Sequence, residues 1–253
     1  MKLGAQLFSV RNLLQTPEDL AQTFRQIRKI GYETVQLSGA APMPAEFLRD
    51  VSRETGLPIV CTHMPFDRIT GDTDALIREH QVFGCPVIGL GSMPNCYRGT
   101  AEGLRAFLKV MEKPVAKIRE AGLAFAYHNH AFEFDPLTDT HGIAYDILIG
   151  ICADWQFIPD TYWIAYAGYS PEAYLRRIGG ERIPNVHLKD MARDAERSIC
   201  ACGEGSLDFA AIIAVCRELG VRNALVEQDN APDSGDPVGQ MALSYRNLSG
   251  LFG

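Results

Sequence analysis

Short apolar runs alternate with helical patterns along the whole chain. Eight of these runs are rich in β-branched and aliphatic residues and read as strands: 2–8, 34–37, 58–63, 87–90, 123–129, 156–161, 185–189 and 223–228. Their ends recur at roughly the 30-residue spacing of a strand–helix unit. The runs are apolar on both faces, which is typical of parallel strands covered by helices.

The segments between the runs carry helix signals. Thr16-Pro17 supplies an N-cap followed by a proline at the first helical position, and Gly31 ends the apolar stripe that follows. Another stripe, over residues 104–118, contains Pro114, which predicts a kink or a split in that helix. Strands and helices therefore alternate in the order expected of an α/β protein.

Eight strand–helix units without a linker or a shift in composition favour one closed barrel. We expect a single (β/α)8 TIM-barrel domain over residues 1–253. The alternative is a doubly wound open sheet, but no GxGxxG dinucleotide fingerprint follows the first run.

Composition and charge limit the classes of partner that the protein is expected to bind. The chain has 24 basic and 31 acidic side chains and a net charge of −7, which weighs against binding to a nucleic-acid backbone. The seven cysteines are scattered and form no CxxC pair, as expected of buried thiols in a reducing compartment. We find no signal peptide and no apolar stretch of about 18 residues, so we expect a cytoplasmic protein with no membrane contact.

Polar residues end several strands, where a barrel carries its active site. Asp160, His187 and Glu227 close three successive runs. Each of them alone reads as a cap or as a member of an ion pair. Together, one histidine and two carboxylates suit one divalent metal ion: Mn²⁺, Co²⁺, Zn²⁺ or Mg²⁺.

The densest cluster of candidate groups lies at the end of the fifth run. His128 and His130 share a face if the strand extends that far, and Glu133 follows in the next loop. These side chains could supply a fourth metal ligand, a general base near neutral pH, or both.

Six segments, in order along the chain, resemble the xylose isomerase-like TIM-barrel superfamily and, within it, the sugar phosphate isomerase/epimerase branch. They are residues 3–11, the Tyr-His-Asn-His-x-x-Glu-Phe motif at 127–134, and residues 160–163, 186–190, 203–208 and 226–229. The resemblance implies one divalent metal ion held by residues that end the fifth to eighth strands.

Carried over by position, Asp160, His187 and Glu227 match the last three ligands of the family. We predict Glu133 as the first ligand, with His128 or His130 facing substrate; His128 as the first ligand is the alternative. Ketose epimerases of the superfamily have a histidine at the position of Trp163. This residue therefore reads either as an aromatic wall for a sugar ring or as part of the core.

The resemblance also implies removal of a proton next to a carbonyl, through an enediolate. We expect Glu227 to act as an acid or base, with His128, His130 or Glu133 in the opposing role. Lys189 lies two residues past His187 and would share its inward face, where it could neutralise the oxyanion. The alternative for Lys189 is a surface pair with Asp190.

The predicted substrate is an unphosphorylated sugar, keto-sugar or cyclitol, because no basic cluster marks a phosphate site. Candidate substrate contacts at strand ends are His63, Gln6, Asn129 and Trp163. Elimination would instead give an inosose dehydratase or a 3-keto-glycoside lyase, and a sugar-binding barrel without turnover is the non-enzyme alternative. The endonuclease IV branch needs many histidines for its zinc ions, and six histidines here argue against DNA repair. The resemblance is compatible with a homodimer.

Overall fold

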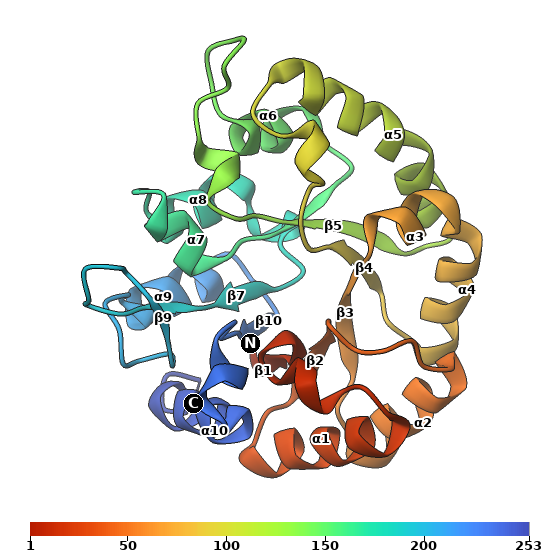
Figure 1. The fold of residues 1–253 in the computed structure, drawn as a ribbon, viewed down its shortest axis with the longest axis vertical. Coiled ribbons are helices and arrows are strands. Elements are labelled where there is room, and N and C mark those ends of the chain that lie inside the picture. Colours follow the sequence, from red (N-terminus) through yellow and green to blue (C-terminus); the bar gives the residue numbers. More distant parts are fainter. Residues whose placement is uncertain (253) are drawn as a thin grey trace.

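A ring of parallel strands forms the centre of the molecule and helices surround it (Figure 1). The computed structural model describes residues 1–252. Within them, the central sheet has eight strands, hydrogen-bonded in the order β6-β5-β4-β3-β2-β1-β10-β7. Their bounds are β1 (Lys2–Gln6), β2 (Thr34–Leu37), β3 (Ile59–Met64), β4 (Val87–Leu90), β5 (Ala124–His128), β6 (Gln156–Ile158), β7 (Val186–Leu188) and β10 (Asn223–Val226).

The two ends of this sheet meet, which closes it into a barrel. An isolated parallel bridge joins Asp160 to His187, and the His187 N–H donates to Pro159 O at 2.9 Å. The predicted α/β class and the (β/α)8 TIM barrel are therefore confirmed. All eight predicted runs contribute a strand, and β2 and β4 have the predicted bounds.

Helices follow the strands and pack around the ring. They are α1 (Pro17–Ile30), α2 (Ala45–Thr55), α3 (Phe66–Gly71), α4 (Thr73–Phe83), α5 (Ala101–Glu120), α6 (Ala144–Ile151), α7 (Thr161–Tyr166), α8 (Pro171–Ile178), α9 (Phe209–Glu218) and α10 (Pro237–Ser249). A small antiparallel pair, β8 (Asp190–Met191) and β9 (Ile199–Cys200), lies after β7. None of the helices within residues 1–252 combines the length and the apolar character needed to cross a bilayer.

Local signals fix the ends of the helices. Thr16 caps α1, since its hydroxyl oxygen accepts from the Asp19 N–H, and Gly31 ends the helix with a φ of 123°. Helix α5, however, continues through Pro114 as one element, so the predicted split does not occur. Proline removes one hydrogen bond, and the buried stripe that includes Phe107 and Met111 holds the helix together.

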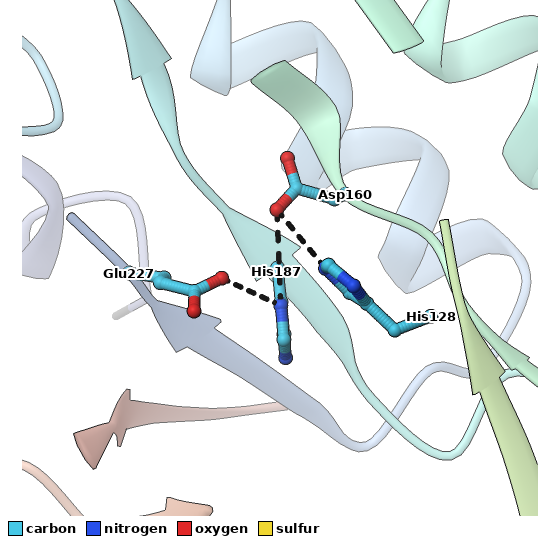
Figure 2. Close-up of side chains that lie close together, drawn as sticks. All are labelled: His128, Asp160, His187 and Glu227. Carbon is cyan, nitrogen blue, oxygen red and sulfur yellow. Dashed lines mark hydrogen bonds and ion pairs between the residues drawn. The ribbon is translucent and has the colours of Figure 1, made fainter. Parts of the chain in front are cut away.

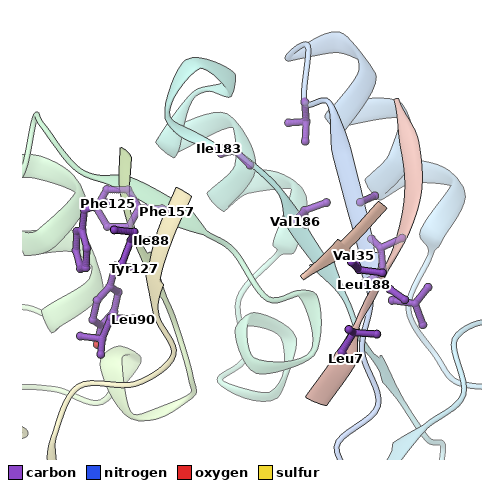
Figure 3. Close-up of a cluster of buried hydrophobic side chains, with 14 of the residues drawn as sticks. Leu7, Val35, Ile88, Leu90, Phe125, Tyr127, Phe157, Ile183, Val186 and Leu188 are labelled. Carbon is purple, nitrogen blue, oxygen red and sulfur yellow. The ribbon is translucent and has the colours of Figure 1, made fainter. Parts of the chain in front are cut away.

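The alternation of β5 divides its side chains between two environments. Phe125 and Tyr127 belong to the large apolar core between strands and helices, part of which is shown in Figure 3. Ala126 points the other way and packs with Ile158 in a small cluster inside the barrel. His128 has the parity of Ala126, so the strand directs its imidazole toward the barrel axis.

Candidate metal centre

Four buried side chains meet at the carboxyl ends of the last four barrel strands. His128 ends β5, Asp160 follows β6, His187 lies in β7, and Glu227 follows β10. Each offers one ligand atom, and these four atoms all lie within 4.8 Å of one another. Figure 2 shows the carboxylates of Asp160 and Glu227 turned toward the two imidazoles.

Hydrogen bonds on the far side of each imidazole orient the rings. His128 Nδ1–H donates to Gly91 O at 2.9 Å, which leaves Nε2 facing Asp160 Oδ2 at 3.3 Å. His187 Nε2–H donates to Gln36 Oε1 at 2.9 Å, which leaves Nδ1 facing Glu227 Oε2 at 2.9 Å. Metal-binding histidines are oriented in this way, with the second ring nitrogen bound to a carbonyl or carboxylate oxygen.

The cluster fits a divalent cation. His187 Nδ1 and Glu227 Oε2 are buried and lie 2.9 Å apart without a well-aligned hydrogen bond between them, and the Lys189 ammonium lies 3.0 Å from Glu227 Oε2. Asp160 uses Oδ1 to cap α7, by accepting from the Trp163 N–H, so Oδ2 is directed to the cluster. Two imidazole nitrogens and two carboxylate oxygens form a donor set that suits Zn²⁺, Mn²⁺ or Co²⁺.

The electrostatics of the cluster favour positive charge between the carboxylates. Burial lowers the pKa of His187, but the carboxylates of Glu227 and Asp160 outweigh it and raise that pKa. Burial would raise the pKa values of Asp160 and Glu227, yet Lys189 and the neighbouring histidines hold both below their ordinary range. Both carboxylates are therefore ionised at neutral pH.

Lys189 belongs to the same cluster and is not a surface residue. Its ammonium lies 3.0 Å from Asp160 Oδ2, 3.0 Å from Glu227 Oε2 and 3.1 Å from Asp229 Oδ2, and its side chain is 1% exposed. Asp190 is occupied elsewhere, because its carboxylate accepts four backbone N–H groups. The alternative of a surface pair between Lys189 and Asp190 is therefore wrong.

Glu133, the predicted first ligand, is not part of the cluster. It is fully buried, and its two oxygens accept from the Tyr127 hydroxyl and the His130 N–H. Burial raises the pKa of Glu133 to about 8. His128, the alternative first ligand, lies beside Asp160 instead, because it is on the inward face of β5, whereas Glu133 lies beyond the strand in the 3₁₀ helix Phe132–Phe134.

A cavity of about 350 Å³ opens beside the cluster. Six of the site residues predicted from the sequence line this cavity: Gln6, His63, His128, His130, Lys189 and Glu227. Gln6 also fixes Glu227, since its Nε2 donates to Glu227 Oε1 at 2.9 Å.

Two predicted substrate contacts lie behind the wall of this cavity. Asn129 Oδ1 accepts from the Asp160 N–H at 3.0 Å, so Asn129 positions Asp160. The centroid of the Trp163 ring lies 5.3 Å from the centroid of the His130 ring. The same centroid lies 5.5 Å from Lys189 Nζ. Trp163 thus supports His130 and Lys189 from the side.

Sequence reasoning missed two members of the site. Gln36 orients His187, and Asp229 both lines the cavity and contacts Lys189. Each had a signal: Gln36 lies near the end of a strand, and Asp229 lies two residues past Glu227 on the same alternation.

Comparisons with known proteins agree with this architecture. A family model described as xylose isomerase-like TIM barrel matches residues 24–241. A search of curated proteins gives no match. A sugar phosphate isomerase/epimerase from Parabacteroides distasonis ATCC 8503 superposes with a TM-score of 0.79 at 20% identity, covering 98% of both chains.

Two further solved structures share the fold. One is an L-ribulose 3-epimerase, with a TM-score of 0.73 at 15% identity, covering 99% of this chain and 93% of that one. The other is the IOLI protein with a bound zinc atom, with a TM-score of 0.73 at 12% identity, covering 99% and 98%. At these identities the similarity extends to the fold alone. Since the family model covers most of its length, the chain belongs to the xylose isomerase-like TIM-barrel family.

Proposed function

We propose that this protein is a divalent-metal-dependent isomerase or epimerase of a sugar, keto-sugar or cyclitol. The observation that carries the proposal is the convergence of His128, Asp160, His187 and Glu227 beside a cavity. The names of the structural relatives support the class of reaction, since they include sugar phosphate isomerase/epimerases and an L-ribulose 3-epimerase. A bound zinc atom in another relative supports the cofactor.

In this proposal the four residues of the cluster hold one metal ion, with His128 in the place first predicted for Glu133. When bound, such an ion supplies Lewis acidity toward carbonyl and hydroxyl oxygens. The reaction removes the proton from the carbon next to the carbonyl, and an enediolate results.

The chain itself supplies acid–base groups from two sides of the cavity. Glu227 follows β10 and is held by Gln6, whereas His130 follows β5. Burial lowers the pKa of His130 to about 3, so the ring is neutral at physiological pH, and its Nδ1 has no partner. One of these groups takes the proton and the other returns it, while the Lys189 ammonium donates to the oxyanion.

The cavity favours an unphosphorylated substrate of about one ring. Its volume of about 350 Å³ lies at the small end of the range for ligand sites. Among the residues that line this cavity in the described part of the chain, the positively charged side chain is Lys189. Its ammonium already contacts three carboxylates. A phosphate group would thus find no uncommitted positive charge there.

Metal titration and proton exchange test the proposal together. Chelator-treated protein is titrated with Mn²⁺, Co²⁺, Zn²⁺ and Mg²⁺ by calorimetry, and a panel of ketoses and a keto-inositol is then followed by NMR in D₂O. We expect one ion per chain and exchange of the proton next to the carbonyl. Elimination would instead give an enone that absorbs in the ultraviolet, which would establish the lyase alternative.

Variants test whether metal binding and proton exchange both depend on the cluster. His187→Ala and Glu227→Gln should lose metal binding and exchange, because the first removes an imidazole nitrogen and the second replaces a charged carboxylate with a neutral amide. His141→Ala, at an exposed loop position, serves as the matched control and should keep both. Absence of metal binding by the wild type, or activity that survives in the cluster variants, would show the proposal to be wrong.

A further inference from the structure

Two candidate ligand atoms of the metal cluster also contact a cation of the chain itself. Asp160 uses Oδ1 to cap α7, and Glu227 uses Oε1 to accept from Gln6 Nε2, so each carboxylate has one oxygen left for a metal ion. Those two oxygens, Asp160 Oδ2 and Glu227 Oε2, each lie 3.0 Å from Lys189 Nζ. A divalent ion and the ammonium would therefore have to share the same two oxygens.

A third carboxylate offers the ammonium a position away from the candidate ligands. Asp229 Oδ2 accepts from Lys189 Nζ at 3.1 Å. Asp229 is not one of the four candidate ligands, and its side chain is 29% exposed and lines the cavity beside the cluster. Its backbone is anchored, since Arg11 Nη1 donates to Asp229 O at 2.9 Å. The ammonium can therefore stay hydrogen-bonded to Asp229 when it leaves the two ligand oxygens.

Hydrogen bonds to Thr161 confine such a movement to the side chain of Lys189. Thr161 Oγ1 accepts from the Lys189 N–H at 3.0 Å and donates to Lys189 O at 2.8 Å, which fixes the backbone. The four-carbon chain of a lysine is flexible, and its ammonium carries three donors in no rigid arrangement. Lys189 can therefore exchange one carboxylate for another by rotation about its side-chain bonds.

The charges favour this exchange when a divalent ion binds. Like charges repel strongly where water is excluded, and the side chains of Lys189, Asp160 and Glu227 are at most 4% exposed. Withdrawal of the ammonium toward Asp229 relieves the repulsion and keeps the lysine charge paired. The three carboxylates then balance one ammonium and one divalent ion.

We propose that Lys189 competes with the metal ion for Asp160 and Glu227, and that Asp229 is the positioning residue that draws its ammonium away from them. Lys189 thereby lowers the metal affinity of the cluster, and Asp229 restores part of that affinity. When the ion leaves, the ammonium pairs the two buried carboxylates in its place. This inference rests on the proposed function, which places a metal ion at the cluster.

Calorimetric titration of chelator-treated variants with Zn²⁺ tests the competition. Lys189→Met removes the ammonium and keeps an unbranched chain, so the zinc dissociation constant should fall at least about tenfold. Asp229→Asn should raise it at least about fivefold, because the ammonium then stays on the ligand oxygens. Lys189→Gln replaces Lys189→Met if the latter fails to fold. Lys117→Met and Asp74→Asn, which alter an exposed lysine–aspartate pair, are the matched controls and should leave the constant unchanged.

A double variant separates this competition from direct attraction of the ion by Asp229. If Asp229 acts by holding the ammonium, Asp229→Asn should change the dissociation constant less than about twofold once Lys189 is replaced. An equal loss of affinity with and without Lys189 would overturn the inference. So would a Lys189 variant that binds zinc no more tightly than the wild type.

The inference and the proposed function can fail separately. Zinc binding by the wild type, with unchanged affinity in the Lys189 variant, would leave the metal site standing and overturn the competition. Zinc binding by the Lys189 variant alone would support the competition but contradict a metal-dependent activity of the wild type. Binding by neither protein would refute both.

Discussion

The orientation of three of the four candidate ligands is set by a residue that supplies no ligand atom itself. Gln36 fixes the ring of His187, Gly91 O fixes that of His128, and Asn129 holds the backbone of Asp160. Such supporting contacts decide which lone pairs face the metal position. The chemistry of the site therefore depends on residues that no ligand motif contains.

Removing the partner of His187 should weaken metal binding. Gln36→Met has similar volume but no acceptor for His187 Nε2–H, so the ring loses its fixed orientation. We expect the metal dissociation constant to rise about tenfold to a hundredfold in a calorimetric titration. Gln156→Met, at the opposite end of the barrel strands, is the matched control and should bind metal as the wild type does. Unchanged affinity in Gln36→Met would contradict the positioning role.

Glu133 should make the protein less stable as the pH rises. Its pKa is raised from an ordinary 4.5 to about 8 by burial, so the folded protein keeps a proton that the unfolded chain releases. Its contribution to stability is present below pH 4.5 and is lost as the pH rises through about 8. Urea unfolding at pH about 5 and about 8 measures the difference.

Glu133→Gln should flatten this dependence, because glutamine does not titrate. At low pH it should cost little, since the carboxyl of Glu133 is then protonated and the amide likewise has an acceptor oxygen for the His130 N–H and a donor for the Tyr127 hydroxyl oxygen. Glu196→Gln, at an exposed position, should leave the pH dependence unchanged. An undiminished slope in Glu133→Gln would assign the effect to other groups.

Individual site residues could be predicted where they lie at the end of an apolar strand pattern. Asp160, His187 and Glu227 end or follow apolar runs, and the carboxyl ends of barrel strands converge, so their proximity could be predicted. The choice between His128 and Glu133 could not be made, because Glu133 lies in a loop whose path follows no period. Hydrogen bonds to Tyr127 and His130 hold it away from the cluster, and these contacts, although local in sequence, belong to no repeating pattern.

At the scale of elements, the strands could be predicted because they are buried on both faces, whereas the last residues of several of them could not. The runs predicted to end at residues 8 and 161 end at Gln6 and Ile158, because Leu7 begins a 3₁₀ helix and Asp160 caps α7. The loop 203–207 shows how such connections are held. Asp190 Oδ2 accepts from the N–H groups of Gly203 and Gly205, both at 2.9 Å.

Asp190→Asn should loosen this loop. The amide keeps one acceptor oxygen and directs an N–H₂ group at backbone donors that the carboxylate bound. Each lost hydrogen bond to a charged group costs about 1–3 kcal/mol, so amides in 203–207 should exchange roughly tenfold faster or more. Asp194→Asn, in the neighbouring exposed turn, should not change their exchange. Equal exchange in both variants would show that other contacts hold the loop.

At the scale of the whole molecule, the barrel is least securely closed between β6 and β7. One isolated bridge joins them, whereas β1 pairs with β10 over four registered residue pairs. The metal cluster straddles this seam: His128 and Asp160 come from one side, and His187 and Glu227 from the other. A bound ion would therefore connect the two edges of the sheet.

Metal binding should stabilise the fold as well as the site. With metal at a hundredfold excess over its dissociation constant, the free energy of unfolding should rise by about 2.7 kcal/mol. Hydrogen exchange should slow most at the His187 amide, which bonds Pro159 O across the seam. The Lys2 amide, which bonds Arg222 O at the opposite end of the β1–β10 pair, is the internal reference. Uniform slowing at both amides would mean that the ion does not act on the seam.

The position of the seam has a consequence for folding. Strands β1 to β6 each pair with the next strand in sequence, so this part of the sheet grows through local contacts. Apart from the Asp160–His187 bridge, β7 joins the sheet through β10, and β10 joins it through β1, which requires the last barrel strands to return to the beginning of the chain. Closing such a long loop costs conformational entropy before any stabilising contact forms, so this step is slow. The four ligands would then come together in the final step, so a newly made chain acquires its metal-binding capacity only when the last strands have docked.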